Sequence, residues 1–185
     1  MKGKVVMAEV DLNKKVLVVY FSRTGEQYSV GNIKEGNTAI IAKMIADRTG
    51  ADLFEIKVVK DNYPARYDEL TKYAKIEKQQ NVRPEIVGNI SNIDDYGTVF
   101  IGYPNWWADL PMPVYTFLEG YDFSNMTVIP FCTHEGSGLG GTQNKVQVAT
   151  KGKMLNGLGV YGHIAQNDKQ KAEKLVSEWL EGLGF

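Results

Sequence analysis

Three hydroxyl residues and an asparagine lie where an apolar strand gives way to a helix. Ser22 and Thr24 follow the unbroken apolar run 16–21, and Asn37 and Thr38 precede a stripe of apolar residues at helical spacing. The first N–H groups of a helix have no acceptor within the helix, and the helix dipole is positive there. Hydroxyl groups add further donors. This order therefore predicts an anion site that could hold a phosphate monoester without a lysine.

Two adjacent tryptophans, Trp106 and Trp107, follow a second apolar run, 98–103, in a loop bounded by Pro104 and Pro111. Neighbouring residues in extended or turn backbone point in different directions, so we expect at most one indole to be simply buried. The other could lie against a flat aromatic ligand, and offset stacking of that kind contributes roughly 0.5–1.5 kcal/mol beyond area burial. The alternative is that both rings fill a hydrophobic corner.

A glycine-rich loop, 133–142, follows another apolar strand. Gly136, Gly138 and Gly141 fit the Gly-x-Gly-x-x-Gly pattern, but three residues separate the strand from the first glycine, and no acidic residue ends the next strand. We interpret these glycines as positions where backbone N–H groups approach a ligand edge closely. His134, in the same loop, is either a donor to that ligand or a residue that orients the loop.

The sequence lacks the signatures of nucleoside triphosphate sites and of dinucleotide sites. Neither Gly25 nor Gly31 begins the Gly-x-x-x-x-Gly-Lys-Ser/Thr run of nucleoside triphosphate sites. The dinucleotide fingerprint needs glycines directly after the first strand, where this chain has residues 22–24. ATP, GTP and dinucleotides are therefore not the expected ligands of this turn.

Hydrolysis and metal chemistry have little support. A serine hydrolase would use Ser22 or Ser137 with His134 and Glu135, but Glu135 occupies the place of the first glycine in a nucleophile elbow. Two histidines, His134 and His163, offer little material for a transition-metal site. We assign no catalytic residue and no metal ligand.

Composition bounds the class of protein. The 185 residues suffice for one compact α/β domain, which we place at 15–185 after an N-terminal extension at 1–14. The single cysteine, Cys132, fits a reducing compartment, and no apolar run reaches transmembrane length. Charged residues interrupt the N-terminus, so we expect no secretory signal and a cytoplasmic location. The net charge of −1 and the lack of a basic cluster argue against nucleic acid as a partner.

Strands and helices alternate along the chain. Asn37 is the predicted N-cap of the first helix, and the polar segment 26–36 is predicted to be a flap rather than a regular element. The expected strands are 16–21, 51–59, 98–103, 126–132 and a fifth in pieces at 154–156 and 159–161. The expected helices are 38–49, 66–78, 111–120, 143–150 and one that begins near 168.

This alternation predicts an α/β fold in which helices cover both faces of a five-stranded parallel sheet. A doubly wound sheet of this size has the order 2-1-3-4-5, which reverses between strands one and three. The loops that begin at Ser22 and Pro104 then meet at the carboxyl ends of those strands, with the loop at Thr133 alongside. A phosphorylated, planar molecule with a polar edge fits all three loops.

The turn at 22–25 and the pair Asn37-Thr38 resemble the two halves of the phosphate loop of the flavodoxin family, Ser-x-Thr-Gly-Asn-Thr, with the insert 26–36 between them. The segments 103–107 and 132–138 resemble a bacterial branch of that family. The resemblance covers 16–185 and implies a flavodoxin-like three-layer sandwich that binds FMN.

The resemblance also implies roles for individual residues. The phosphate would lie at the turn formed by Ser22, Arg23, Thr24, Gly25, Asn37 and Thr38. The isoalloxazine or the ribityl chain would contact Pro104, Asn105, Trp106 and Trp107. The pyrimidine edge of the flavin would be bordered by Thr133, His134, Gly136 and Ser137.

Two redox functions remain open on these residues. One is an electron carrier between redox partner proteins, and the other is an FMN-dependent NAD(P)H oxidoreductase acting on quinones or similar small acceptors. Electron carriers dock through charged patches, which the near-zero net charge does not favour. The segment 26–36 favours the oxidoreductase weakly, because it could shape a substrate pocket.

Overall fold

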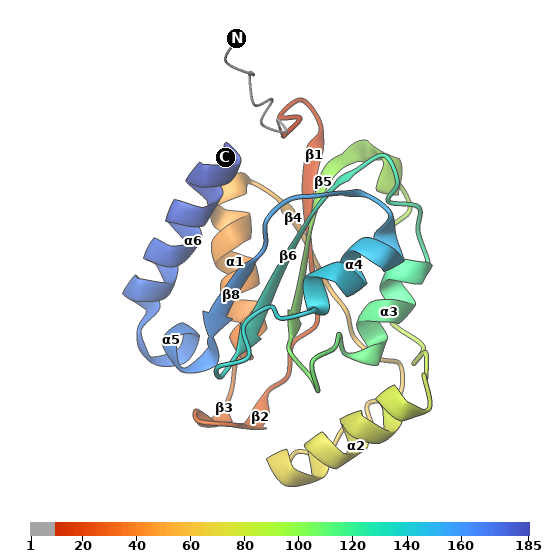
Figure 1. Ribbon diagram of the computed structural model, residues 1–185, viewed down its shortest axis with the longest axis vertical. Coiled ribbons are helices and arrows are strands. Elements are labelled where there is room, and N and C mark those ends of the chain that lie inside the picture. Colours follow the sequence, from red (N-terminus) through yellow and green to blue (C-terminus); the bar gives the residue numbers. More distant parts are fainter. Residues whose placement is uncertain (1–9) are drawn as a thin grey trace.

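A computed structural model of the chain describes residues 10–185, so most of the predicted extension 1–14 lies outside the described residues. The main sheet is built from strands that all run parallel, in the order β4-β1-β5-β6, and both β7 and β8 pair with β6 (Figure 1). Its strands are β1 (Lys15–Tyr20), β4 (Asp52–Glu55), β5 (Tyr96–Pro104), β6 (Thr127–His134), β7 (Lys153–Met154) and β8 (Leu158–Tyr161). The predicted order 2-1-3-4-5 is confirmed.

The fifth strand of that order is broken into β7 and β8. β6 pairs with β7 through Thr127 and Val128, and with β8 only from Phe131 onward. Pro130 lies in the gap, and proline has no N–H to donate to a neighbouring strand. The break therefore follows from one residue in the middle of β6.

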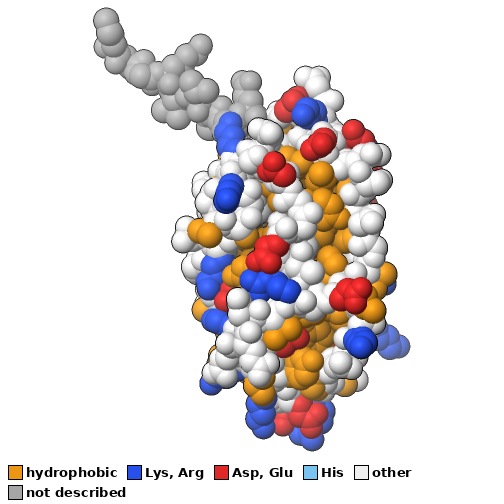
Figure 2. Space-filling model, turned by 90° about the vertical axis from the view of Figure 1, so that its right-hand side faces the viewer, with side chains coloured by type: hydrophobic (Ala, Val, Ile, Leu, Met, Phe, Trp, Pro, Cys, Tyr) orange, Lys and Arg blue, Asp and Glu red, His pale blue; other side chains and the backbone are white. Residues whose placement is uncertain are grey.

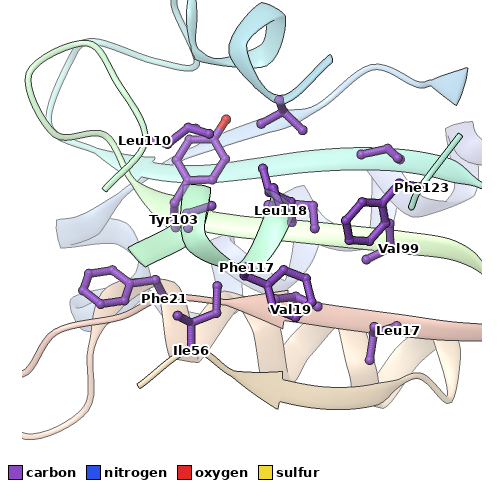
Figure 3. Packing of buried hydrophobic residues seen from close by; sticks show 14 of the residues in the cluster. Leu17, Val19, Phe21, Ile56, Val99, Tyr103, Leu110, Phe117, Leu118 and Phe123 are labelled. Atoms are coloured by element: carbon purple, nitrogen blue, oxygen red, sulfur yellow. The ribbon is translucent and has the colours of Figure 1, made fainter. Parts of the chain in front are cut away.

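Helices cover both faces of the sheet. On one face lie α1 (Asn37–Thr49), α5 (Gly162–Asn167) and α6 (Lys169–Leu183), and on the other lie α3 (Met112–Glu119) and α4 (Thr142–Thr150) (Figure 1). Each face has its own buried cluster. Figure 3 shows the cluster on the α3 side, where Phe117 and Leu118 meet β1 and β5 side chains such as Val19 and Val99.

The sequence predicts that the segment 26–36 is a flap rather than a regular element, and this prediction is wrong. The segment forms an antiparallel hairpin of β2 (Gly25–Gln27) and β3 (Gly31–Ile33). Ser29 and Gly31 hold positive φ values of 61° and 75° at its tip, a backbone conformation that tight hairpins require. The polar composition of the segment concealed this hairpin.

Two other local predictions are wrong. Gly36, and not Asn37, is the N-cap of α1, and Asn37 is the first helical residue. The strand predicted at 51–59 ends at Glu55, and Val58 forms an isolated bridge with Ile86 instead. A short 3₁₀ helix, η1 (Ile93–Asp95), precedes β5.

One helix stands apart from both layers. α2 (Tyr67–Gln79) lies with the β2–β3 hairpin beyond the carboxyl ends of the strands, on the side where the site loops emerge (Figure 1). Of the helices within 10–185, none has the length and apolar character needed to cross a membrane.

Candidate functional site

A cavity of about 500 Å³ lies at the carboxyl ends of β1, β5 and β6. This is where the strand order reverses, the usual place for a ligand in an open α/β sheet. Asn37 and Trp106 both line it, so the two ends of the predicted ligand site share one cavity. The predicted residues in its lining are Asn37, Pro104, Asn105, Trp106, Trp107, Thr133, His134 and Ser137.

The N-terminus of α1 forms one end of this cavity. The backbone N–H of Ala39 donates to Ser22 Oγ at 3.1 Å, so the predicted phosphate turn is tied to the helix. Within residues 10–185, the backbone N–H groups of Asn37 and Thr38 have no acceptor, as the start of a helix leaves them. Gln166 Nε2 donates to Asn37 Oδ1 at 2.9 Å, which orients the Asn37 amide.

Thr38 lies behind the cavity. Its hydroxyl shares a 2.8 Å hydrogen bond with that of Thr133, and the two side chains are buried, at 1% and 4% exposure. This bond joins the first turn of α1 to the end of β6 across the sheet. The direct role of the Thr38 hydroxyl in phosphate binding stays a prediction.

Arg23 is bound to residues outside the cavity lining. Its guanidinium donates to Asp61 Oδ2 at 2.6 Å and to the Tyr63 carbonyl at 3.4 Å, and it lies over the Tyr63 ring. Like Arg23, the predicted residues Ser22, Thr24, Gly25, Thr38 and Gly136 are not in the cavity lining. Their part in ligand binding remains a prediction.

The tryptophan loop holds its two indoles differently. Trp106 is half-buried, and its ring packs edge-on against Phe21 and Tyr63 at centroid distances of 5.4 and 5.6 Å. Trp107 is 47% exposed, and its Nε1 donates to the Thr71 carbonyl of α2 at 2.8 Å. The expectation that at most one indole is simply buried is confirmed.

A tight turn sets this arrangement. Trp106 and Asp109 exchange two backbone hydrogen bonds of 3.1 Å, and the central residues Trp107 and Ala108 both have φ of +56°. Positive φ at both central positions is the signature of a type I′ turn and is costly for residues other than glycine. The carboxylate of Asp109 is buried and anchors the loop through Tyr115 and Lys145, at 2.6 and 3.1 Å.

His134 has a defined tautomer. Its Nδ1 accepts a hydrogen bond from the Gly136 N–H at 2.9 Å, so the proton of the neutral ring is on Nε2. Burial lowers the pKa of His134, and the ring lies 4.6 Å from that of Tyr161. Asn105 Nδ2 donates to the Gly138 carbonyl at 3.0 Å, which ties the glycine-rich loop to the tryptophan loop.

Glu135 faces His163 and not His134. Its carboxylate accepts from the backbone N–H and from Nδ1 of His163, both at 2.7 Å. A serine hydrolase built on His134 needs Glu135 to orient that ring, and the Glu135 carboxylate makes no hydrogen bond to His134. Burial raises the pKa of Cys132 to about 12, so its thiol remains protonated, as expected for a small core residue.

The cavity has few charges. Glu135 is the only Asp, Glu, Lys or Arg in its lining, and no group of three potential metal ligands occurs within residues 10–185.

Sequence reasoning missed one wall of the cavity. It is lined by residues of the hairpin and of α2, namely Gln27, Tyr28, Tyr67, Leu70, Thr71 and Ala74. Tyr28 lies in the segment 26–36, which the sequence predicts to be a flap. The apolar stripe of α2 was visible in the sequence, but no local signal places that helix beyond the ends of the strands.

Comparisons with known proteins identify the family and the fold. The model of a family described as Flavodoxin matches residues 15–182. A candidate flavoprotein from Bacteroides eggerthii is 28% identical, with 94% of this chain and 99% of that chain covered and a TM-score of 0.72. A candidate flavoprotein from Bacteroides uniformis is 27% identical, with 89% of this chain and 98% of that chain covered and a TM-score of 0.70.

A flavoprotein from Lactobacillus acidophilus, solved in complex with FMN, shares the fold. It is 24% identical, with 85% of this chain and 99% of that chain covered and a TM-score of 0.62. No curated protein matches this chain.

Proposed function

This chain belongs to the flavodoxin family, with FMN as its cofactor, and we propose that it carries electrons between redox partner proteins through FMN bound between Asn37 and Trp106. The observation that carries this proposal is that one cavity contains both a helix N-terminus and an aromatic wall. The first suits a phosphate, and the second suits a planar ring system.

The residues present fit FMN part by part. The free N–H groups at Asn37 and Thr38 suit the phosphate, and the indole of Trp106 offers an apolar wall to the ring system. Asn105 and Ser137 present amide and hydroxyl groups to a polar edge. A volume of about 500 Å³ is within the usual range for a cofactor site.

FMN supplies the redox chemistry when it is bound, and the protein binds it, orients it and sets its surroundings. Trp106, braced by Phe21 and Tyr63, keeps water from one side of the cavity. His134 holds its proton on Nε2, because Nδ1 accepts from Gly136.

A second candidate is an FMN-dependent NAD(P)H oxidoreductase that acts on quinones or similar acceptors. The hairpin and α2 favour it, because they add a wall that phosphate and ring binding do not require. Figure 2 shows the face on the α2 and α3 side, where positive and negative side chains are interspersed rather than gathered into one field. Such a surface gives weak electrostatic steering to a protein partner.

Binding and reduction of the purified protein test both functions. We expect added FMN to lose fluorescence on binding. We expect Trp106→Ala to raise the Kd for FMN roughly threefold to tenfold. Val148→Ala, at an exposed position on α4, is the matched control. A protein that leaves FMN fluorescence unchanged contradicts both functions.

The two functions separate on their electron donor. Rapid bleaching of the bound flavin by NAD(P)H alone indicates the oxidoreductase. Bleaching by a reducing partner or by dithionite, with no NAD(P)H oxidation, indicates the carrier.

A further inference from the structure

The segment between β7 and β8 contains the only Asn–Gly pair in the sequence, Asn156–Gly157. Asparagine is especially prone to deamidation before glycine, because glycine has no Cβ to shield its backbone nitrogen from the asparagine side chain. Asn156 is exposed to solvent, and neither residue lines the cavity. The pair is therefore a candidate site of covalent modification that is separate from the proposed FMN site.

The fold requires glycine at position 157. A Cβ there would lie 2.5 Å from the carbonyl oxygen of Pro130 and 2.9 Å from its Cγ. Pro130 is the residue at which the pairing of β6 is broken, so the Gly157 peptide lies directly against that break. A larger residue would have to push the two segments apart. The reactivity of Asn156 therefore cannot be reduced through the neighbour that causes it, and only contacts with other elements can suppress it.

Both polar groups of the peptide that joins Asn156 to Gly157 are hydrogen-bonded to helices. The N–H of Gly157 donates to Gln143 Oε1 of α4 at 3.1 Å. The carbonyl of Asn156 accepts from Trp179 Nε1 of α6 at 2.9 Å. Since α4 and α6 cover opposite faces of the sheet (Figure 1), this one peptide is clamped from both sides.

The clamp acts on the atom that starts deamidation. The Gly157 nitrogen must lose its proton and turn toward the side-chain carbon of Asn156 before it can attack. The bond to Gln143 holds that proton, and the bond from Trp179 opposes rotation of the peptide. The rate in the folded protein is then the rate in the unfolded chain multiplied by the fraction of time that the peptide is open.

We propose that Asn156 is a deamidation site that Gln143 and Trp179 hold closed by clamping the Asn156–Gly157 peptide. When the peptide opens, the Gly157 nitrogen forms a bond to the side-chain carbon of Asn156. The bond from this carbon to the amide nitrogen breaks, and ammonia leaves with the proton of the Gly157 nitrogen. Water then opens the cyclic imide to give aspartate or isoaspartate. The net reaction consumes a water molecule and releases ammonia, with no oxidation or reduction.

α4 also provides a matched control. Gln147, one turn after Gln143, donates from Nε2 to the carbonyl of Gly152 at 3.0 Å. The two glutamines therefore hold the opposite ends of the segment that contains β7, and only Gln143 contacts the reactive peptide. Gln147→Ala removes a hydrogen bond of the same kind from the same helix and leaves the clamp intact.

The test measures deamidation of the purified full-length protein in mildly alkaline buffer, well below its Tm. Peptide mass spectrometry follows the replacement of the Asn156 amide by a carboxyl group over time. We expect Gln143→Ala to raise the rate roughly threefold to tenfold, because the Gly157 N–H loses its acceptor. Trp179→Phe keeps an aromatic ring but removes the donor, so its rate should rise as well. Gln147→Ala should leave the rate close to that of wild type.

The chain unfolded in urea gives the rate without any clamp. A folded wild-type protein that deamidates as fast as this chain would show that the peptide is not held closed. Equal acceleration by Gln143→Ala and Gln147→Ala would assign the effect to lost stability of α4, and an unchanged rate for Gln143→Ala would also overturn the clamp. No step involves FMN, so these outcomes are independent of the proposed function.

Discussion

The hydroxyl groups of Thr38 and Thr133 lie 2.8 Å apart in the interior, although 95 residues separate them in the chain. The bond joins the first turn of α1 to the last residues of β6. Asn37 and His134, the neighbours of these threonines, both line the cavity. A buried hydrogen bond thus sets the distance between the Asn37 and His134 ends of the cavity.

Removing one partner of this bond should be costly. Thr38→Val leaves the Thr133 hydroxyl buried and unpaired, so we expect the free energy of unfolding to fall by about 1–3 kcal/mol. Thr133→Val should act similarly, and the double variant should lose much less than the sum, because no orphaned hydroxyl remains. Urea denaturation of the four proteins measures this coupling, and strictly additive losses would show that the bond contributes nothing.

Gly36 lies where a side chain cannot fit. A Cβ at this position would be 2.0 Å from Ser22 Oγ and 2.7 Å from the Arg23 carbonyl. Gly36→Ala should therefore lower the free energy of unfolding by about 1–3 kcal/mol and weaken FMN binding, because the turn must move off the helix. Gly182→Ala is the control, since a Cβ there meets no atom within 4 Å and should stabilise α6 by up to about 1 kcal/mol. Equal effects of the two substitutions would contradict the close approach.

Ala108 has a backbone conformation that glycine adopts more easily. Its φ is +56°, in the tight turn that follows Trp106. Ala108→Gly should therefore raise the free energy of unfolding by roughly 0.5–1 kcal/mol, which corresponds to a Tm increase of about 1–4 °C. The control Ala46→Gly, in the interior of α1, should lower stability by about 1 kcal/mol. A fall in Tm for Ala108→Gly would argue against strain in this turn.

His134 should make the stability of the protein depend on pH. Burial lowers its pKa in the folded state below the ordinary value of 6.5, so the unfolded chain binds more protons near that pH. The stability that its neutral ring provides is complete above about pH 6.5 and is lost as the pH falls through the lowered value. Protonation at Nδ1 also removes the acceptor of the Gly136 N–H.

Thermal unfolding between pH 5 and 8 tests this expectation. His134→Gln should flatten the acid side of the Tm profile relative to wild type. An unchanged profile would mean that other groups cause the acid sensitivity.

The sequence alone determined the layers of this protein and predicted several of the residues that line its cavity. The apolar runs at 16–21 and 98–103 are typical of strands buried in a parallel sheet, and that sheet brings the loops at Ser22 and Pro104 together. Local patterns were sufficient to predict these layers, because the burial of a strand and the periodicity of a helix both depend on residues that are close together in the sequence.

The tertiary structure alone decided how the cavity is closed. Tyr28 and Tyr67 meet because a hairpin and a helix pack against each other beyond the ends of the strands, and no spacing in the sequence encodes that contact. The same holds for Thr38 and Thr133, since a hydroxyl pairs with whatever buried partner the fold supplies. Side-chain contacts between distant segments depend on the three-dimensional placement of whole elements, which the pattern along one chain does not specify.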